Sequence, residues 1–163
     1  MRKILAGFIM DGHGGGVDNY LLNFLENTAS EDVEIDFLTN DIDKDLEEFL
    51  RKYHSRLFAI ANLKHPVKQF RQVCRIIEEG QYDMVYLNVS TAIDCVAAWA
   101  AKRKKVKRIL VHSHSSGNDC ENTGKRIIFN MIHYICRLFS TGRLQNITVV
   151  PRKLVSGFFL KRL

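Results

Sequence analysis

Short apolar runs rich in β-branched residues alternate along this chain with segments of helical periodicity. Runs of this kind are typical of parallel strands that are buried on both faces, and the helical segments between them are long enough to cross from one strand to the next. The predicted strands are residues 3–10, 33–39, 56–61, 84–88 and 108–113. This alternation predicts a single α/β domain with a Rossmann-like, doubly wound parallel sheet.

Helical spacing of apolar residues predicts five helices. The first three are marked by Val17, Tyr20, Leu21, Phe24 and Leu25, by Leu46, Phe49, Leu50 and Tyr53, and by Val67, Phe70, Cys74 and Ile77. The third helix has Pro66 in its first turn, where the missing N–H costs nothing, and Gly80 is predicted just past its end. Residues 91–104 and 125–139 are the fourth and fifth predicted helices.

Polar loops follow three of the predicted strands. They are the glycine loop "MDGHGGGVD" after the first strand, "NVSTA" after the fourth and "HSHSSGND" after the fifth. In doubly wound sheets, ligands bind beyond the carboxyl ends of the strands. We therefore expect the functional site at these three loops.

The glycine loop fits neither of two common phosphate-binding motifs. A dinucleotide fingerprint requires a third glycine where Val17 stands and an acid at the end of the second strand, whereas three strand residues follow Asp36. A P-loop requires a Lys-Ser/Thr pair, which does not follow these glycines. Two interpretations remain: a tight turn, or bare backbone N–H groups at a helix N-terminus that meet an anionic ligand. Asp18 lies in the first turn of that helix, where a carboxylate favours the helix dipole.

Two histidines occur at the end of the fifth strand. His112 and His114 are two residues apart, so in a strand they point to the same side. An imidazole at this position is suited to accept a proton from a hydroxyl group near the glycine loop. The alternative is that the histidines hydrogen-bond loop backbone. No third ligand has a spacing that indicates zinc, so no metal site is predicted.

The net charge of +6 comes largely from "AKRKKVKR", residues 101–108. Such a stretch attracts anionic lipid or a phosphorylated substrate, or it is a solvated helix end. It lacks interleaved aromatic residues and any nucleic-acid motif, so a nucleic-acid partner is not expected. The four cysteines contain no C-x-x-C pair, and no apolar run reaches the length of a membrane span. These features favour a cytoplasmic protein with reduced cysteines.

The stretches "GFIMDGHGGGVDNYLLNFLENT", "YDMVYLNVSTAID" and "VKRILVHSHSSG" together resemble the N-terminal half of GT-B retaining glycosyltransferases of family 4. The resemblance covers about residues 1–140 and is strongest to the bacterial branch that builds capsular polysaccharides and exopolysaccharides. In this family the first loop reads G-G-x-E, and here Gly15, Gly16, Val17 and Asp18 stand in its place. The family's "H-S-H-N-S" corresponds to residues 112–116, with Ser115 at the Asn position.

The resemblance implies the acceptor side of an enzyme that transfers a sugar from a nucleotide-sugar to a lipid-linked saccharide. It implies that His112 and His114 are catalytic, that Gly14, Gly15, Gly16 and Val17 approach the donor phosphates, and that Asn88, Ser90 and Ser115 lie on the acceptor side. The nucleotide-sugar is a co-substrate, and no cofactor or metal is implied. A lipid-linked acceptor implies a peripheral position at the inner membrane face, which suits the basic stretch.

The sequence does not show a donor-binding domain after residue 140, and residues 141–163 are predicted as an atypical tail, which a frameshift would explain. The chain alone is therefore expected to be inactive. Two other functions stay open: a non-catalytic Rossmann-like module that pairs with a donor-domain subunit, and a fragment of a nucleotide-binding oxidoreductase.

Overall fold

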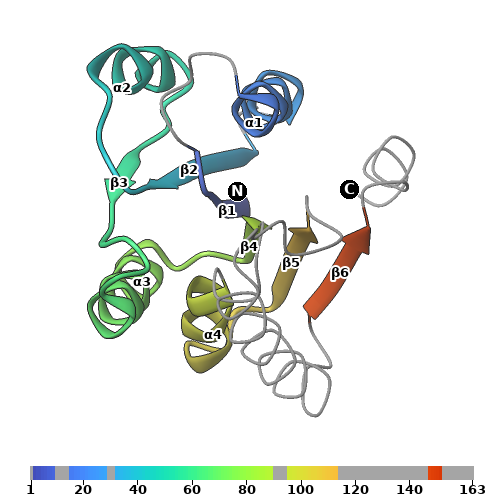
Figure 1. Cartoon of the computed structure of the whole chain (residues 1–163). Helices are drawn as coiled ribbons and strands as arrows, with labels where there is room; N and C mark the ends of the chain where they lie inside the picture. Colours follow the sequence, from blue (N-terminus) through green and yellow to red (C-terminus); the bar gives the residue numbers. More distant parts are fainter. Residues whose placement is uncertain (1, 10–14, 29–31, 90–94, 114–146, 152–163) are drawn as a thin grey trace.

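A six-stranded parallel sheet forms the centre of the molecule, in the order β3-β2-β1-β4-β5-β6. The computed structural model describes residues 2–9, 15–28, 32–89, 95–113 and 147–151 (Figure 1). The strands are β1 (Arg2–Gly7), β2 (Val33–Thr39), β3 (Leu57–Ala59), β4 (Met84–Val89), β5 (Arg108–Ser113) and β6 (Ile147–Pro151). The strand order reverses between β1 and β4, which confirms the predicted doubly wound architecture.

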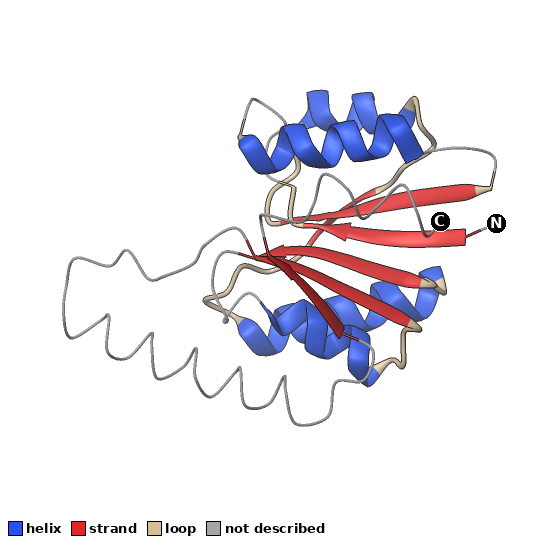
Figure 2. Ribbon diagram, turned by 90° about the vertical axis from the view of Figure 1, so that its right-hand side faces the viewer, coloured by secondary structure: helices blue, strands red, loops and turns tan. Residues whose placement is uncertain are grey.

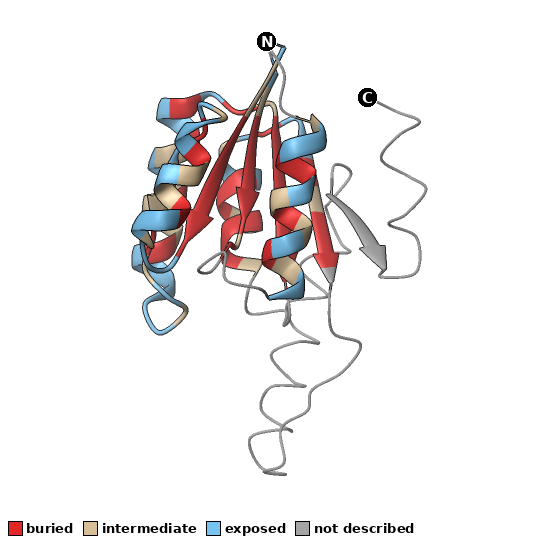
Figure 3. Ribbon diagram, turned by 90° about the horizontal axis from the view of Figure 1, so that it is seen from above, coloured by how far each residue is buried: buried red, intermediate tan, exposed pale blue. Residues whose placement is uncertain are grey.

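Helices cover both faces of this sheet. In the described part of the chain, α1 (Gly16–Thr28) and α2 (Lys44–Arg51) lie on one face, and α3 (Pro66–Gly80) and α4 (Val96–Arg103) lie on the other (Figures 1 and 2). Each strand–helix–strand crossover buries a helix stripe against apolar strand residues, which explains the two separate apolar clusters of the core. The buried residues accordingly gather along the strands and the inward faces of the helices (Figure 3).

All five predicted strands are present in the structure, but not every boundary agrees. The second and fifth have the predicted limits, whereas β1 ends at Gly7 and β3 has only three residues. The prediction missed β6, which pairs in parallel with β5 from Ile109↔Ile147 to Ser113↔Pro151. The run "ITVV" that forms it is short and lies in the segment predicted as an atypical tail. The helix predicted at 125–139 lies outside the described residues, as do residues 91–94 of the fourth.

The prediction for the apolar face of α3 is wrong at Val67, the first residue assigned to that face. Val67 is 62% exposed, whereas Gln69, Val73 and Ile77 are buried. Phe70 packs at the margin of the core, half-buried. The helix begins at Pro66, so its first turn lies at the edge of the sheet, where a valine has no strand to pack against.

The end of α3 also differs from the prediction. Gly80 is the last helical residue rather than the residue beyond it, and Gln81 takes the left-handed conformation at φ 52°. The Gln81 backbone N–H donates to the Ile77 carbonyl, and its side-chain amide donates to the Glu78 carbonyl. The glycine is needed for another reason: a Cβ at this position would lie 2.6 Å from Cζ of Tyr82. Close packing against an aromatic ring therefore explains Gly80.

A buried carboxylate fixes that tyrosine. Asp36, fully buried in the middle of β2, accepts a hydrogen bond from the Tyr82 hydroxyl and bonds from the backbone N–H, Nε and Nη2 of Arg56. Burial and the bond to Asp36 raise the pKa of Tyr82, and the bond to Asp36 also raises the pKa of Arg56. Both groups therefore keep their protons, and the network ties β2, β3 and the α3–β4 turn together.

Candidate functional site

The register between β4 and β5 places two polar side chains at the carboxyl edge of the sheet. Asn88 lies opposite His112, and both residues are buried. Side chains at paired positions of neighbouring strands point to the same face, and Tyr86, two residues before Asn88, shares that face. It is the face covered by α1, because Tyr86 packs in the same cluster as Leu21 of that helix.

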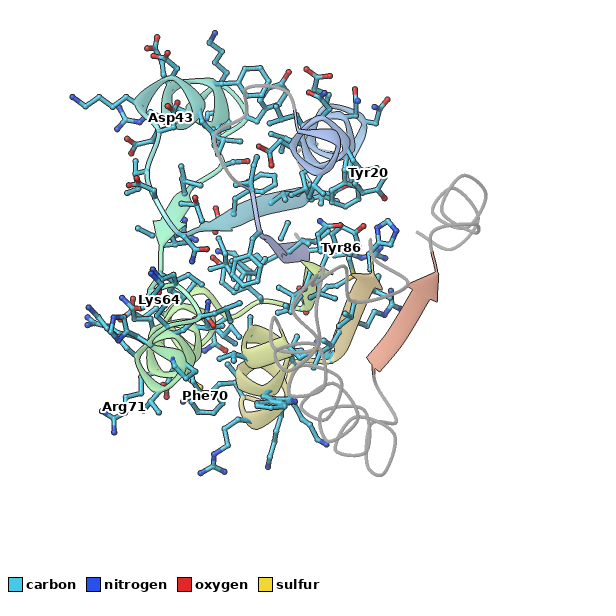
Figure 4. The ribbon with its side chains drawn as sticks, in the orientation of Figure 1. Tyr20, Asp43, Lys64, Phe70, Arg71 and Tyr86 are labelled. Carbon is cyan, nitrogen blue, oxygen red and sulfur yellow. The ribbon has the colours of Figure 1, made fainter. Side chains whose placement is uncertain are left out.

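Tyr20 of α1 completes this group. Its ring lies edge-on to the His112 ring, with centroids 5.8 Å apart, and 6.3 Å from the ring of Tyr86. The Tyr86 hydroxyl lies 3.1 Å from Nδ1 of His112, within hydrogen-bond distance. Burial, followed by a hydrogen bond to Tyr20, raises the pKa of Tyr86. Figure 4 shows Tyr20 and Tyr86 between the helix and the sheet. We call Tyr20, Tyr86, Asn88 and His112 the Tyr-His cluster.

The glycine loop enters α1 at the same edge of the sheet. Gly15 and Gly16 are exposed, and neither has a positive φ. Among the described residues, a Cβ at Gly16 would meet nothing within 4 Å, and one at Gly15 would meet only Asp18, at 3.9 Å. Neither a turn nor close packing explains these two glycines, in contrast to Gly80. Their bare N–H groups remain accessible at a helix N-terminus, which suits an anionic group.

Asp18 and Val17 follow these glycines in the first turn of α1. Val17 packs half-buried at the edge of the α1 cluster. Asp18 is 1% exposed, so its carboxylate is buried rather than turned toward solvent. The position agrees with a carboxylate that stabilises the positive end of the helix dipole.

The structure describes only some of the predicted site residues. It brings Asn88 and His112 together and places Gly15, Gly16 and Val17 at the same edge of the sheet. Gly14, Ser90, His114 and Ser115 lie outside the described residues. The prediction missed the contacts of Tyr20 and Tyr86 with His112, because it assigned these tyrosines only to a helix face and a strand. The alternation "YLN" in β4 was the available signal, because it puts Tyr86 and Asn88 on one face.

The acid that a dinucleotide site requires is engaged elsewhere. Asp36 lies opposite Leu5 in the middle of the sheet, and both of its oxygens accept hydrogen bonds from Arg56. A ribose-binding acid has to lie at the carboxyl end of the strand with free acceptor capacity. This geometry argues against the oxidoreductase interpretation.

Two further searches cover only the described residues. No three His, Cys, Asp or Glu side chains in that part of the chain lie together in a way that could hold a metal ion. None of its helices combines the length and the apolar character that crossing a membrane requires.

Comparison with known proteins agrees with this fold. The structure is similar to MurG of Acinetobacter baumannii, with a TM-score of 0.55 and 12% identity over 79% of this chain and 39% of that one. It is also similar to sucrose-phosphate synthase of Thermosynechococcus elongatus, with a TM-score of 0.56 and 12% identity over 93% of this chain and 48% of that one. The chain thus spans less than half the length of these structures and matches one half of a GT-B fold.

A third solved structure, a putative UDP-N-acetylglucosamine 2-epimerase of Listeria monocytogenes, has a TM-score of 0.50 and 11% identity, over 82% of this chain and 36% of that one. No curated protein matches the sequence. The sequence model described as "Glycosyltransferase Family 4" matches residues 14–154, which include the second half of the glycine loop and β6. The chain therefore belongs to glycosyltransferase family 4.

Proposed function

We propose that this domain is the acceptor side of a retaining family 4 glycosyltransferase. In this proposal the enzyme transfers a sugar from a nucleotide-sugar to a lipid-linked saccharide of a bacterial capsule or exopolysaccharide, at the inner face of the cytoplasmic membrane. A second domain or a partner subunit binds the nucleotide. The glycine loop approaches the donor across the cleft, and the Tyr-His cluster receives the acceptor.

The observation that carries this proposal is the pairing of two features at one edge of the sheet. Gly15 and Gly16 are glycines without a described structural need, and the polar side chains of Asn88 and His112 lie at the same edge of the sheet. Backbone N–H groups suit the donor phosphates, while amide, phenol and imidazole groups suit the hydroxyls of a sugar.

The chemistry assigned to His112 is proton transfer from the acceptor. As the acceptor oxygen bonds to the anomeric carbon, its hydroxyl proton moves to an imidazole nitrogen, and the nucleoside diphosphate leaves. The amide of Asn88, opposite His112 on β4, can orient the same hydroxyl by a hydrogen bond. His114 is assigned a role beside His112, and Ser90 and Ser115 are assigned to acceptor binding. The loop residues Gly14 and Val17 are assigned to the donor side.

Acceptor binding tests the proposal directly. A water-soluble, short-chain polyprenyl-diphosphate sugar is expected to bind the chain, and Asn88→Ala is expected to weaken binding about fivefold, because one hydrogen bond is worth about 1 kcal/mol. The measurement is isothermal titration calorimetry. Asn23→Ala on the exposed side of α1 is the matched control and should bind like the parent.

Titrations of NAD and a UDP-sugar against the same sample discriminate the alternatives. Tight binding of NAD alone would overturn the proposal in favour of the oxidoreductase interpretation. A donor-domain subunit that co-purifies with the chain would favour a module in a split enzyme. Equal affinity of Asn88→Ala and the parent for the acceptor would remove the Tyr-His cluster from the acceptor site.

The basic stretch at 102–108 is proposed to contact anionic lipid. It follows α4 at the amino edge of the sheet, where Lys104 pairs with Glu78 at 2.6 Å and Lys107 with Asp83 at 3.2 Å. The strand β5 separates this edge from His112 by four residues, about 13 Å at the usual strand rise. If a membrane lies at this edge, the saccharide head of a lipid-linked acceptor could reach the site, whereas the lipid chain would stay in the membrane.

Vesicle binding with charge-matched variants tests this contact. Lys102, Arg103 and Lys105 are exposed, and replacing all three by glutamine is expected to weaken binding to phosphatidylglycerol vesicles roughly 100-fold, at about 1 kcal/mol per charge. The control replaces Lys64, Lys68 and Arg71 of the α3 region by glutamine, which removes the same charge (Figure 4). Co-sedimentation is the measurement. An equal loss in both variants would mean that net charge alone drives binding.

A further inference from the structure

The four members of the Tyr-His cluster differ in their exposure to solvent. His112 is 4% exposed, and Tyr86 and Asn88 are buried as well, whereas Tyr20 is half-buried. An acceptor that arrives from solvent therefore meets Tyr20 before it meets the other three. We propose that Tyr20 is a gating residue, whose ring shields His112 in the free chain and turns aside when an acceptor enters. This inference rests on the proposed function of His112 in proton transfer.

The Tyr20 ring is placed to shield the imidazole from the side of α1. The centroids of the Tyr20 and His112 rings are 5.8 Å apart, and the two planes meet at 67°. Rings at this distance and angle are packed edge to face. No sugar fits between two rings in such contact, and Nε2 of His112 is buried. The hydroxyl of an acceptor can therefore reach this imidazole only after a neighbouring group has moved.

Tyr20 is the member of the cluster that can move without opening the core. Tyr86 is 1% exposed, packs against Phe24 with centroids 5.7 Å apart, and lies on a strand that pairs on both sides. Asn88 and His112 lie on interior strands too. A half-buried side chain on a helix can change its rotamer with the backbone in place, and exposed side chains do so rapidly. Tyr20 is the member on such a helix.

The start of α1 leaves room for this rotation. A side chain on a helix leans toward the N-terminus, over the residues three and four positions before it. For Tyr20 these residues are Val17 and Gly16. Gly16 has no side chain, and a Cβ there would meet no described atom within 4 Å. A ring that turns toward the helix start thus meets open space among the described residues, and Gly16 gains a second use besides its bare N–H group.

Chemical labelling of His112 in the unliganded chain is the experiment. Diethyl pyrocarbonate transfers an ethoxycarbonyl group to an accessible imidazole nitrogen, and fragment-ion mass spectrometry separates the label on His112 from that on His114. Tyr20→Ala is expected to speed the labelling of His112 at least about tenfold, because a minor open conformation of the parent is populated to about 0.1–10%. Tyr20→Phe keeps the ring, so its rate should stay within about twofold of the parent rate.

Two controls separate a gate from general loosening of the fold. Tyr53→Ala removes another half-buried tyrosine, which packs against Phe49 of α2, and should leave the labelling of His112 unchanged. His65, exposed at the start of α3, should be labelled at one rate in every variant, and faster than His112 in the parent. Equal labelling of His112 in the parent and Tyr20→Ala would overturn the inference, as would a parent in which His112 reacts as fast as His65.

A measurement on the parent chain keeps the inference testable if Tyr20→Ala does not fold. Turning one ring exposes little surface, so labelling of His112 through the gate is expected to be nearly independent of urea below the unfolding transition. A rate that rises with urea as steeply as global unfolding would contradict the gate, because His112 would then react only in the unfolded chain.

The proposed function fails separately, because both measurements are made without an acceptor. A chain whose labelling depends on Tyr20 but which binds no acceptor would keep the gate and lose the role of His112 in transfer.

Discussion

Gly80→Ala is expected to lower the free energy of unfolding by about 2–4 kcal/mol, although alanine is the better helix residue by about 1 kcal/mol. The added Cβ would lie 2.6 Å from Cζ and 2.9 Å from the hydroxyl oxygen of Tyr82. That ring cannot simply turn aside, because it is 5% exposed and its hydroxyl donates to the buried carboxylate of Asp36. Moving it leaves a buried carboxylate with one fewer donor, which costs about 1–3 kcal/mol. Urea denaturation measures the change.

A second substitution separates the clash from other effects at this position. In a Tyr82→Ala background the ring is absent, so Gly80→Ala is expected to cost nothing or to stabilise slightly. Gly16→Ala at the start of α1 is the matched control and should change stability by less than about 1 kcal/mol, because a Cβ there meets no described atom within 4 Å. The same cost of Gly80→Ala in both backgrounds would contradict the proposed contact with Tyr82.

These two glycines show where sequence reasoning reaches its limit. Gly80 and Gly16 are both glycines near a helix end. Sequence patterns alone would explain both of them in the same way, as residues that end or begin a helix. The structure separates them by what lies across from each: a buried ring in one case and open space among the described residues in the other. Contacts between Gly80 and Tyr82 depend on how the turn after α3 folds back, and this information is not contained in local spacing.

The sheet could be predicted because parallel strands carry their signal locally. The strand β4 is buried throughout, and β5 buries Ile109, Val111 and His112, so each appears as a short apolar run with a polar residue near its carboxyl end. The same rule predicted that the polar stretches that begin at Asn88 and His112 lie at the carboxyl edge of the sheet. It missed β6, because a run of five residues is too short to be distinguished from a loop by its sequence.

The partners of His112 could not be predicted in the same way. Tyr20 fits the apolar face of α1, and Tyr86 fits a buried strand, so both have a sufficient explanation as core residues. They lie beside His112 because α1 packs over β4 and β5, as the ring contacts of Tyr20 show. Crossing position is a tertiary property, set by which helix face packs on which strands.

The chain alone, supplied with a nucleotide-sugar and a saccharide acceptor, is expected to release no nucleoside diphosphate. The Tyr-His cluster contains no lysine or arginine that could stabilise the charge of a departing diphosphate. The bare N–H groups at Gly15 and Gly16 offer only part of the required stabilisation. Loss of leaving-group stabilisation costs a factor of about 100–1,000 for each missing donor, so without a second domain the expected turnover falls below detection.

A diphosphate-release assay tests this expectation when it includes the His112→Ala variant and a separately produced donor-binding half. The parent chain should give the same rate as His112→Ala and as buffer, and adding the separately produced donor-binding half should raise only the parent rate. Turnover by the parent chain alone that His112→Ala abolishes would contradict the expectation, because the site would then hold everything that transfer requires. In that case Gly15 and Gly16 would bind the donor phosphates without a second domain, and Gly16→Ala, which leaves the fold intact, should lower the rate of the chain itself.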